Sequence, residues 1–256
     1  MKAPDRHEEI ASYVIEKGEV RIDTLIAEFG VSRMTIHRAI DRLAQKGVLR
    51  KLHGAVSAQP SGIYESLFRY RQTVATRQKA ALARAALAHI SPGQIVMLDD
   101  STTAAALAPL LEEVAPLTVV TNSVEAVAAL KDRDGVDVIC AGGQYHRTYN
   151  AYLGHLCLAA IHALRANLFL CSASAIDGTT AFIQDQQVVG IKQAMMASSS
   201  RRILMADHTK FGKGALHVFE SLSAFDLVLV DDKVEPDTLR RLKEAHIPLQ
   251  IVRTPA

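Results

Sequence analysis

Basic side chains are concentrated in one short stretch of this 256-residue chain. Residues 31 to 54 hold six lysines and arginines and a single acidic residue, Asp41, whereas the whole chain has a formal net charge of only +2. Arginine, lysine and histidine donate hydrogen bonds to phosphate oxygens and to the edges of bases. This stretch therefore has the chemistry for contact with a polyanion such as DNA.

The apolar pattern around these residues predicts a helix, a tight turn, a second helix and a basic β-ribbon. Leu25, Ile26 and Phe29 are spaced as in a helix, and Gly30 can end it by adopting a positive φ. Ser32 is expected to cap the second helix. The buried stripe of that helix is predicted from Met34, Ile36, Ile40 and Leu43.

Gly47 is expected to end the second helix, and residues 48 to 54 are expected to form a wing. The pattern is that of a winged helix-turn-helix, in which the second helix reads DNA and the wing lies along its backbone. A winged helix used for protein contacts is the alternative. The residues expected to contact DNA are Ser32, Arg33, Thr35, His37, Arg38 and Arg42 on the helix and Arg50, Lys51 and His53 on the wing.

A second group of polar residues follows the predicted strands of the remaining chain. Residues 99 to 103 read Asp-Asp-Ser-Thr-Thr before a predicted helix, where hydroxyls and free backbone N–H groups can bind phosphate. An ordinary helix cap explains them equally well. Three further segments have the composition of caps and turns, and each indicates ligand binding less strongly than residues 99–103 do. They are residues 121–123, 142–143 and 177–178.

The elements that must position these groups alternate between helix and strand, which predicts a largely parallel sheet with helices on both faces. Strands are predicted at 95–98, 118–121, 136–140, 168–171, 203–206, 227–230 and 249–252. Helices are predicted at 76–89, 102–112, 123–130, 151–164, 186–199 and 236–245. Ligands bind at the carboxyl ends of the strands in such sheets.

Composition narrows the class of protein further. The chain is 49% hydrophobic and 22% charged, as in soluble globular proteins. It has no apolar run of 18 residues and no apolar core of a signal peptide. We therefore expect a cytoplasmic protein without membrane contact. The three cysteines have no Cys-x-x-Cys pairing and are predicted to be buried free thiols. The histidine spacing favours no metal site, and no cofactor is expected.

Residues 6 to 56 resemble the DNA-binding domain of the DeoR family of bacterial transcriptional regulators. The similarity lies in Phe29-Gly-Val-Ser32, Thr35-Ile36, Arg38 and His53-Gly54. This chain has His37 where the family usually has arginine, Ala39 where an acid is usual, and Ala55 in place of a second glycine. A different operator sequence is therefore expected.

The resemblance continues to about Asp231, through residues 98–103, 121–123, 142–143, 177–178 and 206–212. It implies a Rossmann-like α/β domain similar to ribose-5-phosphate isomerase that senses a phosphorylated sugar or polyol. A glycine common in the family's first loop is absent here, and Val188-Val189 stand where an acid is frequent. The effector residues that the resemblance implies are Asp99, Ser101, Thr102, Thr103, Asn122, Gly143, Asp177, Lys192 and Lys210, with the phosphate at residues 101–103.

These observations predict a winged helix-turn-helix at 1–57, a connecting segment at 58–75 and an α/β effector domain at 76–256. The predicted function is transcriptional regulation, as the repressor of a carbohydrate-utilisation operon whose operator binding responds to a phosphorylated sugar or polyol. Reading two half-sites on double-stranded DNA requires a homodimer or tetramer. The alternative is a sugar-phosphate isomerase with an accessory DNA-binding domain. An isomerase needs a base beside the substrate, and this sequence has no well-placed glutamate for that role.

Overall fold

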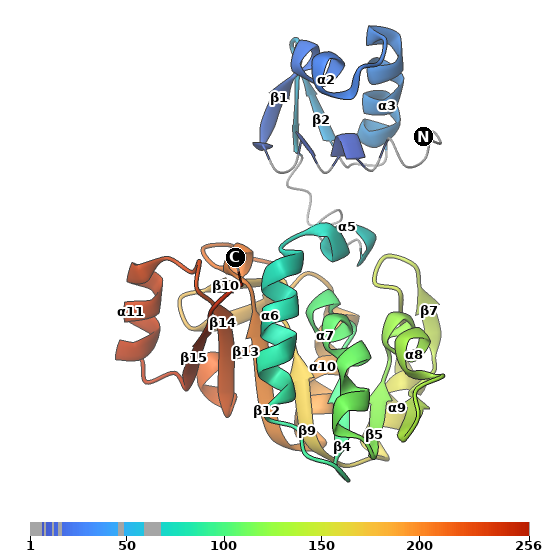
Figure 1. Cartoon of the computed structure of the whole chain (residues 1–256), viewed down its shortest axis with the longest axis vertical. Helices are drawn as coiled ribbons and strands as arrows, with labels where there is room; N and C mark the ends of the chain where they lie inside the picture. Colours follow the sequence, from blue (N-terminus) through green and yellow to red (C-terminus); the bar gives the residue numbers. More distant parts are fainter. Residues whose placement is uncertain are drawn as a thin grey trace. The chain divides into compact units, whose positions relative to one another are not determined.

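A computed structural model describes residues 7, 9–11, 13–14, 17–45, 49–58 and 68–255 of the chain. The chain divides into two compact units, Met1–Thr73 and Val74–Ala256 (Figure 1). Each unit has its own hydrophobic core. No helix among these described residues is long and apolar enough to cross a membrane.

The N-terminal unit has the predicted helix-turn-helix and wing. Its elements are β1 (Glu19–Arg21), α2 (Ile22–Phe29), α3 (Arg33–Gln45), β2 (Leu49–Leu52), β3 (Ala55–Ala58) and α5 (Phe68–Thr73). The strands form an antiparallel sheet in the order β1-β3-β2. Gly30 ends α2 with a φ of 59°, as predicted. Ser32 Oγ accepts a hydrogen bond of 3.3 Å from Thr35 N at the start of α3, which confirms the predicted helix cap.

One residue of the predicted buried stripe is misplaced. Met34 is 66% exposed, while Ile36, Ile40 and Leu43 are buried as expected and Ala39 completes the apolar face. Met34 lies two residues before Ile36, a rotation of about 200° around the helix, and therefore on the outer side. The predicted helix end at Gly47 and the predicted start of the wing strand at Val48 lie outside the described residues, and so do residues 59–67 of the connecting segment.

The C-terminal unit is built on a seven-stranded sheet in the order β15-β14-β12-β9-β4-β5-β6, and every pairing is parallel, as predicted. Its strands are β4 (Ile95–Leu98), β5 (Leu117–Thr121), β6 (Val136–Cys140), β9 (Ala166–Cys171), β12 (Ser199–Ala206), β14 (Leu227–Asp231) and β15 (Leu249–Val252). All seven predicted strands are present, and several are longer than expected.

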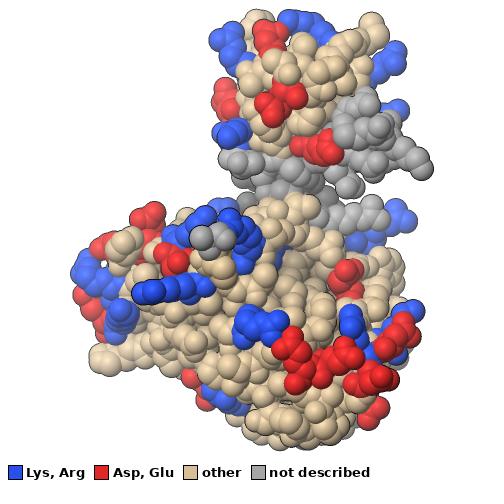
Figure 2. Space-filling view, in the orientation of Figure 1, with Lys and Arg blue, Asp and Glu red and all other residues tan. Residues whose placement is uncertain are grey.

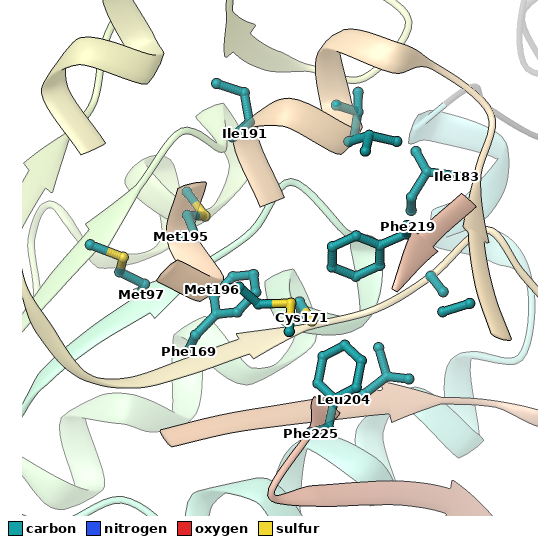
Figure 3. Packing of buried hydrophobic residues seen from close by; sticks show 14 of the residues in the cluster. Met97, Phe169, Cys171, Ile183, Ile191, Met195, Met196, Leu204, Phe219 and Phe225 are labelled. Atoms are coloured by element: carbon teal, nitrogen blue, oxygen red, sulfur yellow. The ribbon is translucent and has the colours of Figure 1, made fainter. Parts of the chain in front are cut away.

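Helices cover both faces of this sheet, as the alternating pattern predicted. The helices are α6 (Thr76–Leu87), α7 (Thr102–Leu107), α8 (Val124–Leu130), α9 (His155–His162), α10 (Gln186–Ala197) and α11 (Pro236–Glu244). Side chains alternate along the strands, so that Val96 and Leu98 pack with α6, α7 and α8 while Met97 packs on the other face. Phe169 and Phe219 are among the large side chains buried on that second face (Figure 3).

Two predicted helices are shorter than expected. The helix expected over residues 102 to 112 ends at Leu107 and continues as a 3₁₀ helix, η1 (Ala108–Val114), because Pro109 cannot donate to the preceding turn. The helix expected over residues 151 to 164 begins only at His155, because residues 151–153 form strand β8 (Ala151–Leu153).

Short hairpins account for the remaining strands, which the sequence pattern did not predict. Strand β7 (Gln144–His146) pairs with β8, and a second small sheet has the order β10-β11-β13. Its strands are β10 (Ala175–Asp177), β11 (Thr180–Ile183) and β13 (His217–Ser221).

The three cysteines are free thiols, but only two are buried. Cys157 and Cys171 are fully enclosed, whereas Cys140 is exposed. The expectation of three buried thiols is therefore wrong for Cys140, which ends strand β6 at the edge of the sheet.

Gly143 has a structural role that can be tested. Its φ is 114°, and an added Cβ would lie 2.6 Å from the Leu153 carbonyl oxygen and 3.1 Å from Cys157 Cβ. Gly143→Ala should lower the free energy of unfolding by at least about 3 kcal/mol in urea denaturation. The matched control is Gly142→Ala, with a φ of 63° and no atom within 4 Å of the added Cβ, which should lose only about 1–2 kcal/mol. Equal losses would contradict the close packing at Gly143.

Candidate functional site

The predicted DNA-binding side chains lie on α3 and on the wing. His37, Arg38 and Arg42 are exposed on α3, and they follow the turn at spacings that keep them off the buried face. Thr35 is half-buried and bonds Ser32, so these two residues organise the start of the helix. The exposed side chains of His37, Arg38 and Arg42 can therefore donate hydrogen bonds to bases and phosphates.

The wing presents a second group of donors. Arg50, Lys51 and His53 are exposed on β2 and in the turn that follows it. Gly54 has a φ of 71° and allows this turn to close onto β3. The wing thus displays its basic residues on a two-stranded ribbon, as predicted.

Two of the predicted DNA-binding residues form ion pairs within the N-terminal unit. Arg33 pairs with Asp23 of α2, and Lys51 pairs with Asp41 of α3. All four side chains are about half exposed or more, so each pair contributes little stability and can be exchanged for a phosphate. Among the described residues, Arg38, Arg42 and Arg50 have no ion-pair partner.

In the α/β domain, buried polar residues collect at the carboxyl ends of the central strands. Asp99 and Asp100 follow β4, Asn122 follows β5, Ser172 follows β9 and Asp207 follows β12. All five are at most 2% exposed. Because neighbouring parallel strands end at the same edge of a sheet, these residues share one region, which we call the carboxyl-edge cluster.

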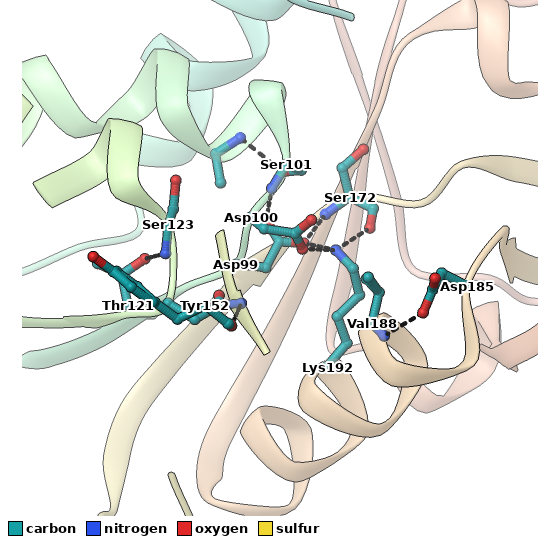
Figure 4. Close-up of polar contacts among 12 residues, drawn as sticks. Asp99, Asp100, Ser101, Thr121, Ser123, Tyr152, Ser172, Asp185, Val188 and Lys192 are labelled. Atoms are coloured by element: carbon teal, nitrogen blue, oxygen red, sulfur yellow. Dashed lines mark hydrogen bonds and ion pairs between the residues drawn. The ribbon is translucent and has the colours of Figure 1, made fainter. Parts of the chain in front are cut away.

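Lys192 reaches into this cluster from α10 (Figure 4). Its ammonium forms an ion pair with Asp99, lies 3.5 Å from Asp100 Oδ1 and donates a hydrogen bond of 3.1 Å to the Ser172 carbonyl oxygen. Asp99 also accepts backbone hydrogen bonds of 3.0 Å from Ser101 and Ser172. Lys192 and Asp99, 93 positions apart in the chain, thus fix α10 against the ends of β4 and β9.

The protonation of Lys192 follows from these neighbours. Burial alone would lower its pKa, but the carboxylates of Asp99 and Asp100 outweigh burial and raise the pKa above the ordinary value of 10.5. The ammonium is therefore charged at neutral pH. One cation faces two anions, which leaves this part of the cluster with a net negative charge.

Several buried polar atoms of the cluster have no hydrogen-bond partner within the described part of the chain. They are Asp100 Oδ1, Asn122 Oδ1, Ser172 Oγ and Asp207 Oδ2. Three of the four can only accept a hydrogen bond. A buried polar atom without a partner is costly, and a ligand or a water molecule that donates hydrogen bonds would satisfy these atoms.

The hydroxyl residues of the first loop are buried beside the cluster. Ser101 is the N-cap of α7, and its Oγ accepts a hydrogen bond of 3.0 Å from Ala104 N. Thr102 and Thr103 form the first turn of α7 and are at most 6% exposed. The capping explanation therefore holds for Ser101, and Thr102 and Thr103 remain the hydroxyls predicted to contact phosphate.

Three other predicted effector residues lie outside the buried cluster. Gly143 packs against Leu153 and Cys157, Asp177 is exposed at the turn between β10 and β11, and Lys210 is half-buried in the 3₁₀ helix η2 (His208–Lys210). The structure thus brings together Asp99, Asn122 and Lys192 with residues 101–103.

Sequence reasoning did not select Asp100, Ser172 or Asp207 as effector residues. Asp207 follows β12, and its second carboxylate oxygen bonds Thr209 N at 3.0 Å. Asp231, at the end of β14, is fully buried and bonds His208 Nδ1 at 3.1 Å. These residues share one sequence feature that could have identified them: each is a polar residue at the end of a strongly apolar stretch, as Asp207 is after Leu204–Met205–Ala206.

The described residues contain no group of three histidine, cysteine, aspartate or glutamate side chains placed to hold a metal ion. A groove of about 560 Å³ lies between α6 and the C-terminal residues 252–255, and it contains none of the predicted effector residues.

On the face of the α/β domain seen in Figure 2, acidic and basic side chains lie beside one another. Arg84–Glu113 and Arg133–Glu112 are exposed ion pairs of this domain.

Comparison with protein families identifies both units. A DeoR-like helix-turn-helix domain matches residues 6–61, and a DeoR C terminal sensor domain matches residues 74–232.

Curated relatives match over nearly their whole length. The uncharacterized HTH-type transcriptional regulator YgbI of Escherichia coli K12 is 30% identical over 97% of this chain and 98% of its own. The glycerol-3-phosphate regulon repressor of the same strain is 29% identical over 98% and 100%, and the L-fucose operon activator of Haemophilus influenzae is 30% identical over 94% and 96%.

Among solved structures, ribose 5-phosphate isomerase A from Methanocaldococcus jannaschii matches 52% of this chain and 53% of its own. The sequence identity is 13% and the TM-score is 0.38.

Removal of the buried ammonium tests the cluster. Lys192→Met should lower the free energy of unfolding by about 3–5 kcal/mol at pH 7, because it leaves two buried carboxylates without a counter-charge. Lys243→Met, on the exposed side of α11, should change it by less than about 0.5 kcal/mol. A loss below about 1 kcal/mol at Lys192 would contradict the ion pair.

The same variant has a predictable pH dependence. Folding raises the pKa of Lys192 above 10.5, so its stabilising contribution is complete below that pH and is lost as the pH rises through the folded-state value. The difference in stability between the wild type and Lys192→Met should therefore shrink above pH 10.5. Urea denaturation at a series of alkaline pH values measures it, and a difference that grows with pH would contradict the direction of the shift.

Proposed function

This chain belongs to the DeoR family of bacterial transcriptional regulators, and we propose that it represses a carbohydrate-utilisation operon in response to a phosphorylated sugar or polyol. Its helix-turn-helix and sensor domains make it a DNA-binding regulator and not an enzyme. The alternative of an isomerase with an accessory DNA-binding domain is therefore wrong.

The effector assignment rests on the buried atoms of the carboxyl-edge cluster that accept no hydrogen bond from the described residues. Asp100 Oδ1, Asn122 Oδ1 and Asp207 Oδ2 accept hydrogen bonds and do not donate them. A sugar or polyol offers several hydroxyl donors on one small frame, which is the complementary chemistry. This complementarity supports a polyhydroxylated ligand at the ends of β4, β5, β9 and β12.

Charge separates the two ends of such a ligand. Asp99, Asp100 and Asp207 would repel a phosphate placed among them, because the single charge of Lys192 balances only one of the three carboxylates. We therefore assign the hydroxyl-bearing end to the cluster. We assign the phosphate to Thr102 and Thr103, which follow Asp99–Ser101 in the same β4–α7 connection and begin α7. Their hydroxyls and backbone N–H groups are of the kind that binds an anion.

The relatives support a carbohydrate effector. One is named for the glycerol-3-phosphate regulon and another for the L-fucose operon, and both align over at least 94% of this chain. One of the two is named a repressor and the other an activator. Repression is our assignment for this chain because several of its relatives are named repressors, among them the glycerol-3-phosphate regulon repressor, which aligns over 98% of the chain.

Reading an operator requires more than one copy of the N-terminal unit. One recognition helix contacts only a few base pairs, so specific binding needs two half-sites and at least a homodimer, assembled as a dimer or tetramer through the α/β domain. The effector can regulate this assembly only if it binds one conformation better than the other. The protein would act in the cytoplasm, where bacterial DNA is located.

Thermal unfolding with a panel of compounds tests the effector assignment. The full-length protein is heated with sugar phosphates and polyol phosphates, and the unphosphorylated compounds are the controls. Stabilisation by a phosphorylated member alone supports the assignment. Equal stabilisation by an unphosphorylated counterpart, or no shift with any member, contradicts it.

The compound identified in this way allows the phosphate contact to be tested. Thr102→Val together with Thr103→Val keeps the side-chain volume and removes both hydroxyls, so effector affinity should fall by about tenfold or more, since two hydrogen bonds to a charged group are lost. Calorimetric titration measures this, and DNA affinity should not change. Thr118→Val, within β5 and away from the carboxyl edge, is the control. Unchanged effector affinity in the double variant would place the phosphate elsewhere.

Arg38 is the strongest single test of the DNA interface. Arg38→Ala removes an exposed guanidinium that has no ion-pair partner among the described residues, and specific DNA affinity should weaken by about 1–3 kcal/mol. Arg240→Ala removes an equal charge from the surface of α11 and should have no such effect. Fluorescence anisotropy measures both, with a DNA duplex that the wild type has selected from a random library as the operator, and equal affinities for Arg38→Ala and wild type would contradict the placement.

A further inference from the structure

Met34 is an apolar side chain exposed in an unusual place. It lies in the first turn of α3 and is 66% exposed, although α3 has a complete apolar face of its own. That face consists of Ile36, Ala39, Ile40 and Leu43, which are all buried. Met34 therefore contributes nothing to the core of the N-terminal unit.

Helical geometry puts Met34 at the middle of the outward face. With about 100° between successive residues, His37, Arg38 and Asp41 lie within about 60° of Met34 around the helix axis. Leu43 lies on the opposite side, about 180° away. The three neighbours are polar, and His37 and Arg38 are exposed, so Met34 is the apolar centre of the surface predicted to face DNA.

The first turn of a recognition helix is the part that meets base edges. In the major groove, the 5-methyl group of thymine is the apolar group that a side chain can contact, and the other edge groups are hydrogen-bond donors and acceptors. Methionine is unbranched and adaptable, so it can follow the surface of a methyl group. Burial of that contact would also remove the exposed apolar area of Met34 from water.

We propose that Met34 contacts a thymine 5-methyl group in each operator half-site and selects thymine at that position. The inference rests on the proposed function, because it requires α3 to enter the major groove. It assigns sequence selectivity to a side chain that has no hydrogen-bond donor and only a weak acceptor. The surrounding His37 and Arg38 then supply the donors for phosphates or neighbouring bases.

Selection from random DNA tests this role of Met34 and determines the operator sequence at the same time. Full-length wild type, Met34→Ala and Met34→Leu each select binding sites from a library of random DNA duplexes. The wild type should select a two-fold symmetric consensus with a thymine at one position of each half-site. Met34→Ala should select the same consensus without that preference, and Met34→Leu, which keeps an apolar side chain of similar volume, should retain it.

A methyl deletion in the DNA gives the matching measurement. Replacement of that thymine by uracil removes only the 5-methyl group, and wild-type affinity per half-site should fall about fourfold, as for one buried methylene-sized group. Met34→Ala should bind both duplexes equally. Thermal unfolding of the variants establishes that they are folded as the wild type is.

The possible outcomes separate the two proposals. If the wild type selects no consensus from the library, the proposed sequence-specific DNA binding is contradicted. If the wild type and Met34→Ala select the same thymine, or lose the same affinity with uracil, the role of Met34 is contradicted while the proposed function stands.

Discussion

The ammonium of Lys192 must be held against two buried carboxylates, and the arrangement of the α/β domain depends on that requirement. Lys192 lies on α10, whereas Asp99 and Asp100 follow strand β4 and Ser172 follows β9. An uncompensated buried charge would cost several kcal/mol, so helix and strands must stay together. This contact fixes the edge of the sheet at which other polar residues gather. It also explains why a lysine occurs in a helix whose other inward residues are apolar.

A fixed edge of this kind is suited to recognition of a small polar molecule. Asp99 is satisfied by Lys192 and two backbone N–H groups, whereas Asp100 Oδ1 has only the Lys192 ammonium at 3.5 Å. Asn122 Oδ1 and Asp207 Oδ2 accept no hydrogen bond from the described residues. A hydroxylated ligand would satisfy them and would bridge the ends of several strands. Such a ligand changes the relative stability of conformations in which those ends lie closer together or farther apart. The N-terminal unit responds only if one of these conformations favours the assembly that binds two half-sites.

The fold was largely predictable because its strands are short, apolar and separated by helices, as in Ile95–Leu98 and Leu249–Val252. The short hairpins, such as β7 and β8, were not, because their polar and aromatic residues show no strand periodicity. In the candidate site, the family resemblance predicts Asp99, Asn122 and Lys192, whereas Ser172 and Asp207 lie near them only through strand pairing that a linear sequence does not specify. Met34 was assigned to the core because it is apolar, and its helical phase shows that it faces outward.

Hydrogen–deuterium exchange of the full-length protein with a stabilising phosphorylated sugar or polyol tests the central claim most directly, because it locates the ligand without a mutation. The account predicts slower exchange in peptides that contain residues 99–104, 122–124, 172–174 and 207–210, and unchanged exchange along the groove between α6 and residues 252–255. Protection confined to that groove, with none at the carboxyl ends of the central strands, would contradict the account.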